Sequence, residues 1–177
     1  MRLTFTLMAV LLATATSALT VRKATVMQLT QDASLVVVGK IVSQAAYWED
    51  GNIYTDVTVA IDQCYKGSPE GKTLVVKNYG GTVGETSQVV AGAPEFVPGD
   101  EVVLFLISWK GEYWIHSIAL GEFAIVIDAG ERYAVNDLSH VGLVDPATNR
   151  EITQADEKIT KVKLETLIQQ VKAFARQ

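Results

Sequence analysis

Two segments rich in β-branched residues constrain the fold of this chain more than any other feature. Residues 33–43 read ASLVVVGKIVS, and a segment that ends at Gly67 reads IYTDVTVAIDQCYKG. The first is an apolar run interrupted by Gly39, and the second alternates apolar and polar side chains, the period of a half-buried strand. The polar stretch YWEDGN lies between them and is typical of a turn or protruding loop. Two strands joined in this way indicate a small closed β-barrel.

Further strands and one helix follow from the rest of the chain. Apolar residues recur with helical spacing from Leu164 to Phe174, which predicts an amphipathic helix packed on the barrel. Residues 79–99 hold five glycines and two prolines and are expected to be a long irregular loop. Later strands are expected at 72–78, 101–109, 113–118, 122–127 and 132–135. The predicted fold is all-β: a five-stranded OB-like antiparallel barrel with a C-terminal α-helix.

The first 18 residues have the pattern of a secretory signal peptide. A positive Arg2 precedes an apolar run from Leu3 to Leu12, and small residues lead up to Ala18. The run is shorter than a membrane span, although a membrane anchor or a buried first helix remains an alternative. We expect an OB-like domain over 19–137, followed by an irregular segment and the amphipathic helix over 138–177. The expected location is extracytoplasmic, either periplasmic or secreted.

The charge balance argues against several classes of partner. The chain has 15 lysines and arginines against 20 aspartates and glutamates, with no basic cluster. Nucleic acids and anionic membranes favour clustered cations, so we predict neither as a partner. No second apolar stretch is long enough to span a bilayer, which predicts no membrane span in the mature chain. Cys64 is the only cysteine, so no intramolecular disulfide can form.

Few residues have the pattern of a catalytic or metal site. The only histidines are His116 and His140, and a zinc site would need help from carboxylates such as Asp137 or Asp145. Cys64 shares a strand face with acidic and polar residues, which disfavours a reactive thiolate. We therefore predict no catalytic residue, no metal, no cofactor and no enzymatic activity. A small metal-dependent enzyme that uses one of the histidines is the less favoured alternative.

Aromatic and apolar residues near the predicted strand ends are the candidate binding residues. OB-type barrels bind ligands on one face and through their connecting loops, where exposed aromatic rings offer large contact area. The alternative is that these rings cap the ends of the barrel core. The candidate partner-binding residues are Tyr47, Trp48, Tyr79, Val89, Val90, Trp109 and Tyr113.

Three motifs resemble the netrin-like, OB-fold domain of the tissue inhibitors of metalloproteinases. They are LVVVGKIVS, TDVTVAIDQCYKG and GDEVVLFLISWKGEYWIHSI, and the likeness covers roughly residues 33–127. The layout GKIVS, YKG, PGDEVVLFL is also similar to a group of uncharacterised exported bacterial proteins. In the inhibitor family an N-terminal cysteine chelates the zinc of the protease. No cysteine here lies near a cleavage site, so that mechanism transfers to no residue of this chain.

These patterns together predict an exported, non-enzymatic binding module that recognises a protein partner through barrel loops. An extracellular protease is one candidate partner, in line with the resemblance. The alternative is a structural cell-envelope protein without a discrete ligand site, in which the 79–99 loop only closes the barrel.

Overall fold

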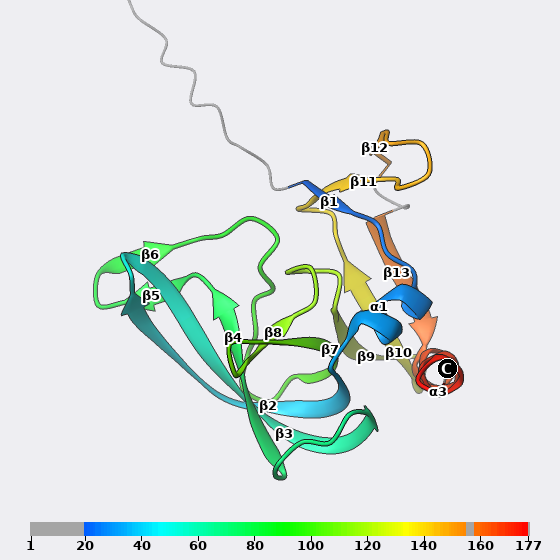
Figure 1. Cartoon of the computed structure of the whole chain (residues 1–177), viewed down its shortest axis with the longest axis horizontal. Helices are drawn as coiled ribbons and strands as arrows, with labels where there is room; N and C mark the ends of the chain where they lie inside the picture. Colours follow the sequence, from blue (N-terminus) through cyan, green and yellow to red (C-terminus); the bar gives the residue numbers. More distant parts are fainter. Residues whose placement is uncertain (1–19, 155–157, 177) are drawn as a thin grey trace, which may run out of the picture.

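The structure is a computed structural model that describes residues 20–154 and 158–176. The predicted signal peptide, residues 1–18, lies outside the described residues. Figure 1 shows a molecule built mostly of strands, with a helix at its C-terminal end. This confirms the predicted mostly-β fold with a C-terminal helix. Among the described residues, no helix has the length and apolar character needed to cross a membrane.

The main sheet has eight strands in the order β13-β10-β9-β7-β2-β3-β4-β8, and β7 also pairs with β8. Pairing therefore runs in a cycle from β2 through β3, β4, β8 and β7 back to β2. Within this cycle β4 and β8 are parallel and the other pairs are antiparallel. The strands are β2 Leu35–Glu49, β3 Asn52–Lys66, β4 Thr73–Tyr79, β7 Glu101–Trp109, β8 Glu112–Ile115, β9 Glu122–Asp128, β10 Glu131–Asp137 and β13 Ile159–Lys163.

Smaller elements lie around this sheet (Figure 1). Strands β1, Thr20–Arg22, β11, Gly142–Val144, and β12, Glu151–Ile152, form a second sheet. Strands β5, Gly81–Val83, and β6, Thr86–Gln88, form a hairpin beside the tip of the β2–β3 hairpin. The 79–99 loop predicted to be irregular therefore contains a short hairpin.

The β2–β3 hairpin is longer than expected. Glu49 pairs with Asn52, which leaves Asp50-Gly51 as a two-residue turn with φ of 48° and 78°. Positive φ at both positions matches the twist of the flanking strands, and Gly51 adopts it without strain. The turn predicted within YWEDGN is therefore confirmed at Asp50-Gly51, but it is shorter than expected, because strand pairing continues through Tyr47 and Trp48 up to this turn. Those two side chains are consequently fixed by strand register.

Gly39 marks one of three points at which β2 changes its register against β3. A Cβ at this position would lie 2.4 Å from the carbonyl oxygen of Ala60, so the two backbones meet as only glycine allows.

Alternate residues of β2 and β7 belong to two separate hydrophobic cores. Val37 and Leu104 belong to a core enclosed by the cycle of strands, whereas Val36 and Phe105 belong to a second core. Helices α1, Val26–Asp32, and α3, Leu164–Phe174, contribute to the second core. Strand β7 is thus covered on both faces, which explains its continuous apolar run. The bounds of α3 are those expected from its apolar stripe.

The segment predicted to be irregular after residue 137 contains strands. β13 pairs along its whole length with residues 133–137 of β10, so the C-terminal part of the chain adds the last strand of the main sheet. Its sequence ITKVK is mostly polar because it is an edge strand, with Lys161 bonded to Asp128 and Lys163 to Glu131 across the sheet. Edge strands with lysines lack the apolar alternation by which strands are recognised.

Candidate functional site

Five aromatic rings form a row across the strands of the cycle. Cross-strand pairing places Tyr47 of β2 opposite Tyr54 of β3, and Tyr54 opposite Tyr79 of β4. The ring centroids of these two pairs lie 6.5 and 5.7 Å apart. Trp114 of β8 then lies 4.9 Å from Tyr79, and Trp109 of β7 lies 6.1 Å from Trp114. We call these five residues the aromatic row; it joins every strand of the cycle.

Lys77 lies beneath the aromatic row and holds its strands together. Its side chain is only 6 % exposed, and its ammonium bonds the carboxylates of Glu49 and Glu112, the latter at 3.0 Å. The nitrogen also lies 4.8 Å from the ring centroid of Tyr54 and 5.4 Å from that of Trp114. Burial lowers the pKa of Lys77, but the bonds to both carboxylates raise it by more, so the amine stays charged.

A pocket of about 360 Å³ opens where the row reaches β7 and β8. Its walls include Tyr79, Ile107, Trp109, Trp114 and Ile118, and we call it the tryptophan pocket. Trp109 is 55 % exposed, whereas Trp114 is 7 % exposed. The indole nitrogen of Trp114 is buried and has no hydrogen-bond partner. The pocket thus combines a large accessible ring with an unsatisfied donor.

The 89–95 segment forms a different kind of surface. Val89 is 88 % exposed, and residues of this segment border a pocket of about 350 Å³ on one side and one of about 660 Å³ on the other. Side chains anchor its C-terminal part: Gln44 donates to the carbonyl of Phe96 at 2.5 Å, and Asn78 donates to that of Pro94 at 2.8 Å. Residues 89–95 belong to no strand.

The structure separates the predicted binding residues into groups. Tyr47, Tyr79 and Trp109 come together in the aromatic row. Trp48 follows Tyr47 along β2 and therefore points to the opposite face, where it pairs with buried Ile53. Tyr113 likewise turns away from the row and packs against the core inside the cycle. Val89 and Val90 lie on the 89–95 segment, outside the row.

Tyr54, Lys77 and Trp114 were missed as site residues by reasoning from the sequence. Tyr54 was detectable, because a two-residue Asp-Gly turn fixes its pairing with Tyr47 once the strand is extended to that turn. Trp114 meets Tyr79 through the parallel pairing of β4 with β8, which no local pattern reveals. Lys77 resembled an ordinary outward-facing lysine, since its carboxylate partners come from distant strands.

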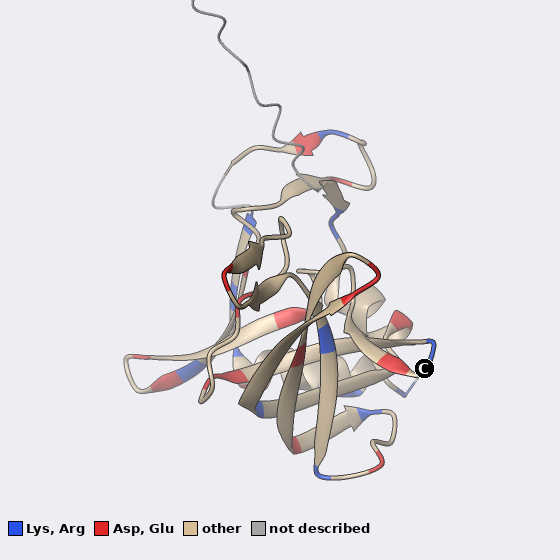
Figure 2. Cartoon of the chain, turned by 90° about the vertical axis from the view of Figure 1, so that its left-hand side faces the viewer, with Lys and Arg blue, Asp and Glu red and all other residues tan. Residues whose placement is uncertain are grey.

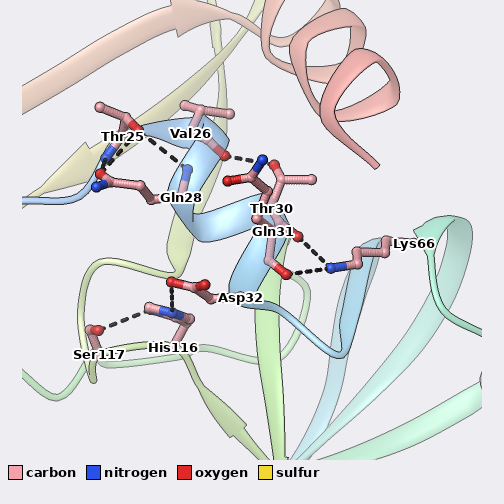
Figure 3. A network of polar contacts seen from close by, with 9 residues as sticks. All are labelled: Thr25, Val26, Gln28, Thr30, Gln31, Asp32, Lys66, His116 and Ser117. Atoms are coloured by element: carbon pink, nitrogen blue, oxygen red, sulfur yellow. Dashed lines mark hydrogen bonds and ion pairs between the residues drawn. The ribbon is translucent and has the colours of Figure 1, made fainter. Parts of the chain in front are cut away.

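His116 belongs to a polar network beside α1 (Figure 3). Its Nδ1 lies 2.9 Å from the hydroxyl of Ser117, and its Nε2 lies 3.7 Å from a carboxylate oxygen of Asp32. Burial lowers the pKa of His116, and the nearby Asp32 partly opposes this shift. The second histidine, His140, borders the 660 Å³ pocket instead. The two histidines therefore lie in different environments.

The same network fixes α1 to the sheet. Thr25 accepts a bond from the backbone of Gln28 in a capping box at the start of the helix. Lys66 at the end of β3 donates to the carbonyls of Thr30 and Gln31 at 2.7 Å each. A cation at the C-terminal end of a helix is favourable, so this network has a structural explanation.

Charge and metal-binding chemistry single out no further site. Figure 2 shows acidic and basic residues interspersed over the strands and loops. In the part of the chain that the structure describes, no three His, Cys, Asp or Glu side chains are grouped to hold a metal ion. Cys64 is exposed; partial burial raises the pKa of its thiol, and a hydrogen bond with the backbone of Lys66 opposes the rise.

Comparison with known proteins gives no relative from which a function can be taken. No protein-family model matches the chain, and a search of curated proteins finds no match either. The geometry of the aromatic row and the tryptophan pocket is therefore the basis for inferring what the protein does.

Proposed function

We propose that this protein is a non-enzymatic binding module that recognises a protein partner through the aromatic row and the tryptophan pocket. The single observation that carries the proposal is the half-exposed ring of Trp109 beside a pocket walled by further aromatic rings. Tryptophan and tyrosine dominate binding energy at protein interfaces, because they supply large contact area with few rotatable bonds. A preformed pocket with such rings fits this role.

The cycle of strands supports an OB-like barrel as the framework of this module. In OB-folds the face of the second and third strands and two connecting loops bind the ligand. Counted along the cycle, the second and third strands are β3 and β4, which carry Tyr54 and Tyr79. Trp109 lies at the β7–β8 connection. The aromatic row therefore lies where an OB-like barrel would present its binding surface.

The resemblance to the netrin-like domain of metalloproteinase inhibitors makes an extracellular protease one class of partner. Export through a signal peptide over 1–18, to the periplasm or the medium, belongs to the same proposal. Without the zinc-chelating cysteine of those inhibitors, any such contact would be made by the outer face of the sheet.

The second candidate is a structural envelope protein. The mutual contacts of the rings and the burial of Lys77 favour it, since both also stabilise the sheet. Hydrogen exchange separates the two functions in the isolated protein. Strong protection of every amide in 79–99 favours the structural function, in which this loop closes the barrel, whereas fast exchange in 89–95 argues against it.

The proposal is tested by affinity capture from the native secreted fraction. We expect Trp109→Ala to lose the captured partner, because its ring supplies the accessible contact area. Trp48→Ala is the matched control, since Trp48 is 52 % exposed but lies outside the row. A second variant lacks Gln88 to Pro94. If wild type, Trp109→Ala and the deletion variant all capture the same proteins, neither the aromatic row nor the 89–95 segment has a binding function.

A further inference from the structure

We infer that the tryptophan pocket binds a proline-containing, extended peptide of the partner, with the indole N–H of Trp114 donating to a peptide carbonyl. This inference rests on the proposed function and deepens it, because it names the chemistry of the segment that is recognised. It starts from the unsatisfied indole nitrogen of Trp114, a side chain that is 7 % exposed and lines the pocket.

A buried donor without an acceptor is unfavourable, and nearly all such groups in folded proteins have a partner. The aromatic row supplies rings around Trp114, including Tyr54 at 5.9 Å and Tyr79 at 4.9 Å, but no oxygen acceptor for its N–H. A ligand oxygen in the tryptophan pocket would satisfy this donor. The pocket is therefore suited to a ligand that brings an acceptor.

The polar groups of the pocket favour a peptide over a saccharide. Its lining includes Tyr79, Trp109, Trp114 and Ser117 but no carboxylate or amide side chain. The hydroxyl of Ser117 is already bonded to His116. Sugar hydroxyls are donors as well as acceptors, and the side chains of this pocket offer them only the hydroxyl oxygens of Tyr79 and Ser117 as acceptors. A proline residue has a carbonyl acceptor and no N–H, so its polar requirements match those of the pocket.

The shape of the pocket also fits proline. Its walls are two indole rings, a phenol ring and isoleucines, and its volume is about 360 Å³. Segments in the polyproline II conformation have no internal hydrogen bonds, expose their carbonyls and lose little entropy on binding. Grooves lined by aromatic rings are the usual recognition sites for such segments.

Access to the indole nitrogen requires the side chains around Trp114 to move, and Trp109 is the most exposed of the aromatic rings that contact it. The nitrogen is covered in the free protein, and Trp109 packs edge-on against Trp114 with half of its own surface exposed. Lys110 lies 4.4 Å from the ring centroid of Trp109 and holds it in this position. Rotation of this exposed ring would uncover the donor and change the surroundings of both indoles.

The test is a titration of the purified protein with an acetylated hexaproline peptide, followed by NMR of the indole N–H groups. The chain has three tryptophans, so three indole signals are to be assigned. We expect saturable shifts of the Trp109 and Trp114 signals, with that of Trp48 unchanged. A glycine-serine hexapeptide is the peptide control, and cellohexaose tests the saccharide alternative.

Variants sharpen this test. Trp114→Phe keeps an aromatic ring but removes the N–H, and we expect it to weaken hexaproline binding about 3- to 10-fold, the range for one hydrogen bond. Trp109→Ala should abolish binding, and Trp48→Ala should leave it unchanged. If Trp114→Phe does not fold, the shift of the Trp114 indole signal in the wild type decides whether this indole contacts the peptide.

The inference is overturned if hexaproline causes no shift, if cellohexaose binds in its place, or if a folded Trp114→Phe binds as tightly as the wild type. Should hexaproline fail while Trp109→Ala still loses the captured partner, only the peptide inference falls. Should Trp109→Ala also capture the partner normally, the proposed function falls with it.

Discussion

The aromatic row and the 89–95 segment are both exposed and apolar, yet they are held in place in opposite ways. Each ring of the row is attached to a strand of the main sheet, and Lys77 ties three of these strands together through Glu49 and Glu112. The 89–95 segment is attached mainly by side-chain bonds from Gln44 and Asn78. The row is thus held by the pairing of the main sheet, whereas the segment is held by a few bonds outside any sheet.

This difference indicates which of the two surfaces can contribute more binding energy. Ordering a flexible segment costs conformational entropy when a partner binds, and a preorganised surface avoids most of that cost. The most exposed apolar side chain, Val89, is therefore a weaker candidate for an interface anchor than Trp109. By exposed fraction alone, Val89 would rank above Trp109 as an interface anchor.

Removing the charge of Lys77 should have the largest effect on the aromatic row. We expect Lys77→Ala to destabilise the fold by about 2–3 kcal/mol, because two carboxylates lose their buried partner. Urea unfolding measures this change. Lys77→Met keeps the apolar stem under the rings and removes only the ammonium, so we expect it to lose most of the same stability. Equal stability of Lys77→Ala and wild type would show that Lys77 does not stabilise the strands of the aromatic row.

The pocket beside the 89–95 segment should make stability depend on pH. Burial, and then the charge of Asp100, raise the pKa of Glu122 to about 7. The folded state therefore holds a proton that the unfolded state releases above its ordinary pKa. This stabilisation is complete below about pH 4.5 and is lost as pH rises through 7. We expect Glu122→Gln to be the more stable protein at pH 8, by at most about 3 kcal/mol.

Urea unfolding of the wild type and Glu122→Gln from pH 5 to pH 8.5 checks this prediction. His116 acts in the opposite sense, because its pKa is lowered by burial and its contribution to stability is lost as pH falls below about 6.5. His116→Asn is therefore the control that isolates the effect of Glu122. Parallel pH curves for wild type and Glu122→Gln would contradict the account.

Val89→Ser should have the smallest effect. The side chain is almost fully exposed, so we expect a change in unfolding free energy below about 0.5 kcal/mol. Partner capture should also change less than for Trp109→Ala. A larger loss of capture for Val89→Ser would mean that the 89–95 segment, and not the aromatic row, is the main contact.

Local sequence patterns predicted the elements but not the site. Alternation and turn residues located most strands, and the apolar stripe located α3, because these features depend on neighbours along the chain. The end of β2 was misplaced because polar residues near Tyr47 resembled a loop, and β13 was missed because an edge strand needs no apolar alternation. Both errors concern strands whose side chains are mostly exposed.

The site depends on contacts that no local pattern contains. Trp114 meets Tyr79 only because a late strand pairs in parallel with an earlier one. Lys77 is buried only because Glu49 and Glu112 arrive from two other strands. Tyr47, Tyr79 and Trp109 were identified as separate exposed aromatic residues. They form one row because of the pairing register between strands that are far apart in the sequence.

The most direct test is hydrogen exchange of the protein with and without its captured partner. The account predicts that the partner adds protection at 75–79 and 107–115, the strand segments that carry Tyr79, Trp109 and Trp114, with a smaller change at 89–95. Protection confined to α1, α3 or the β10–β13 edge, with none at 107–115, would contradict it.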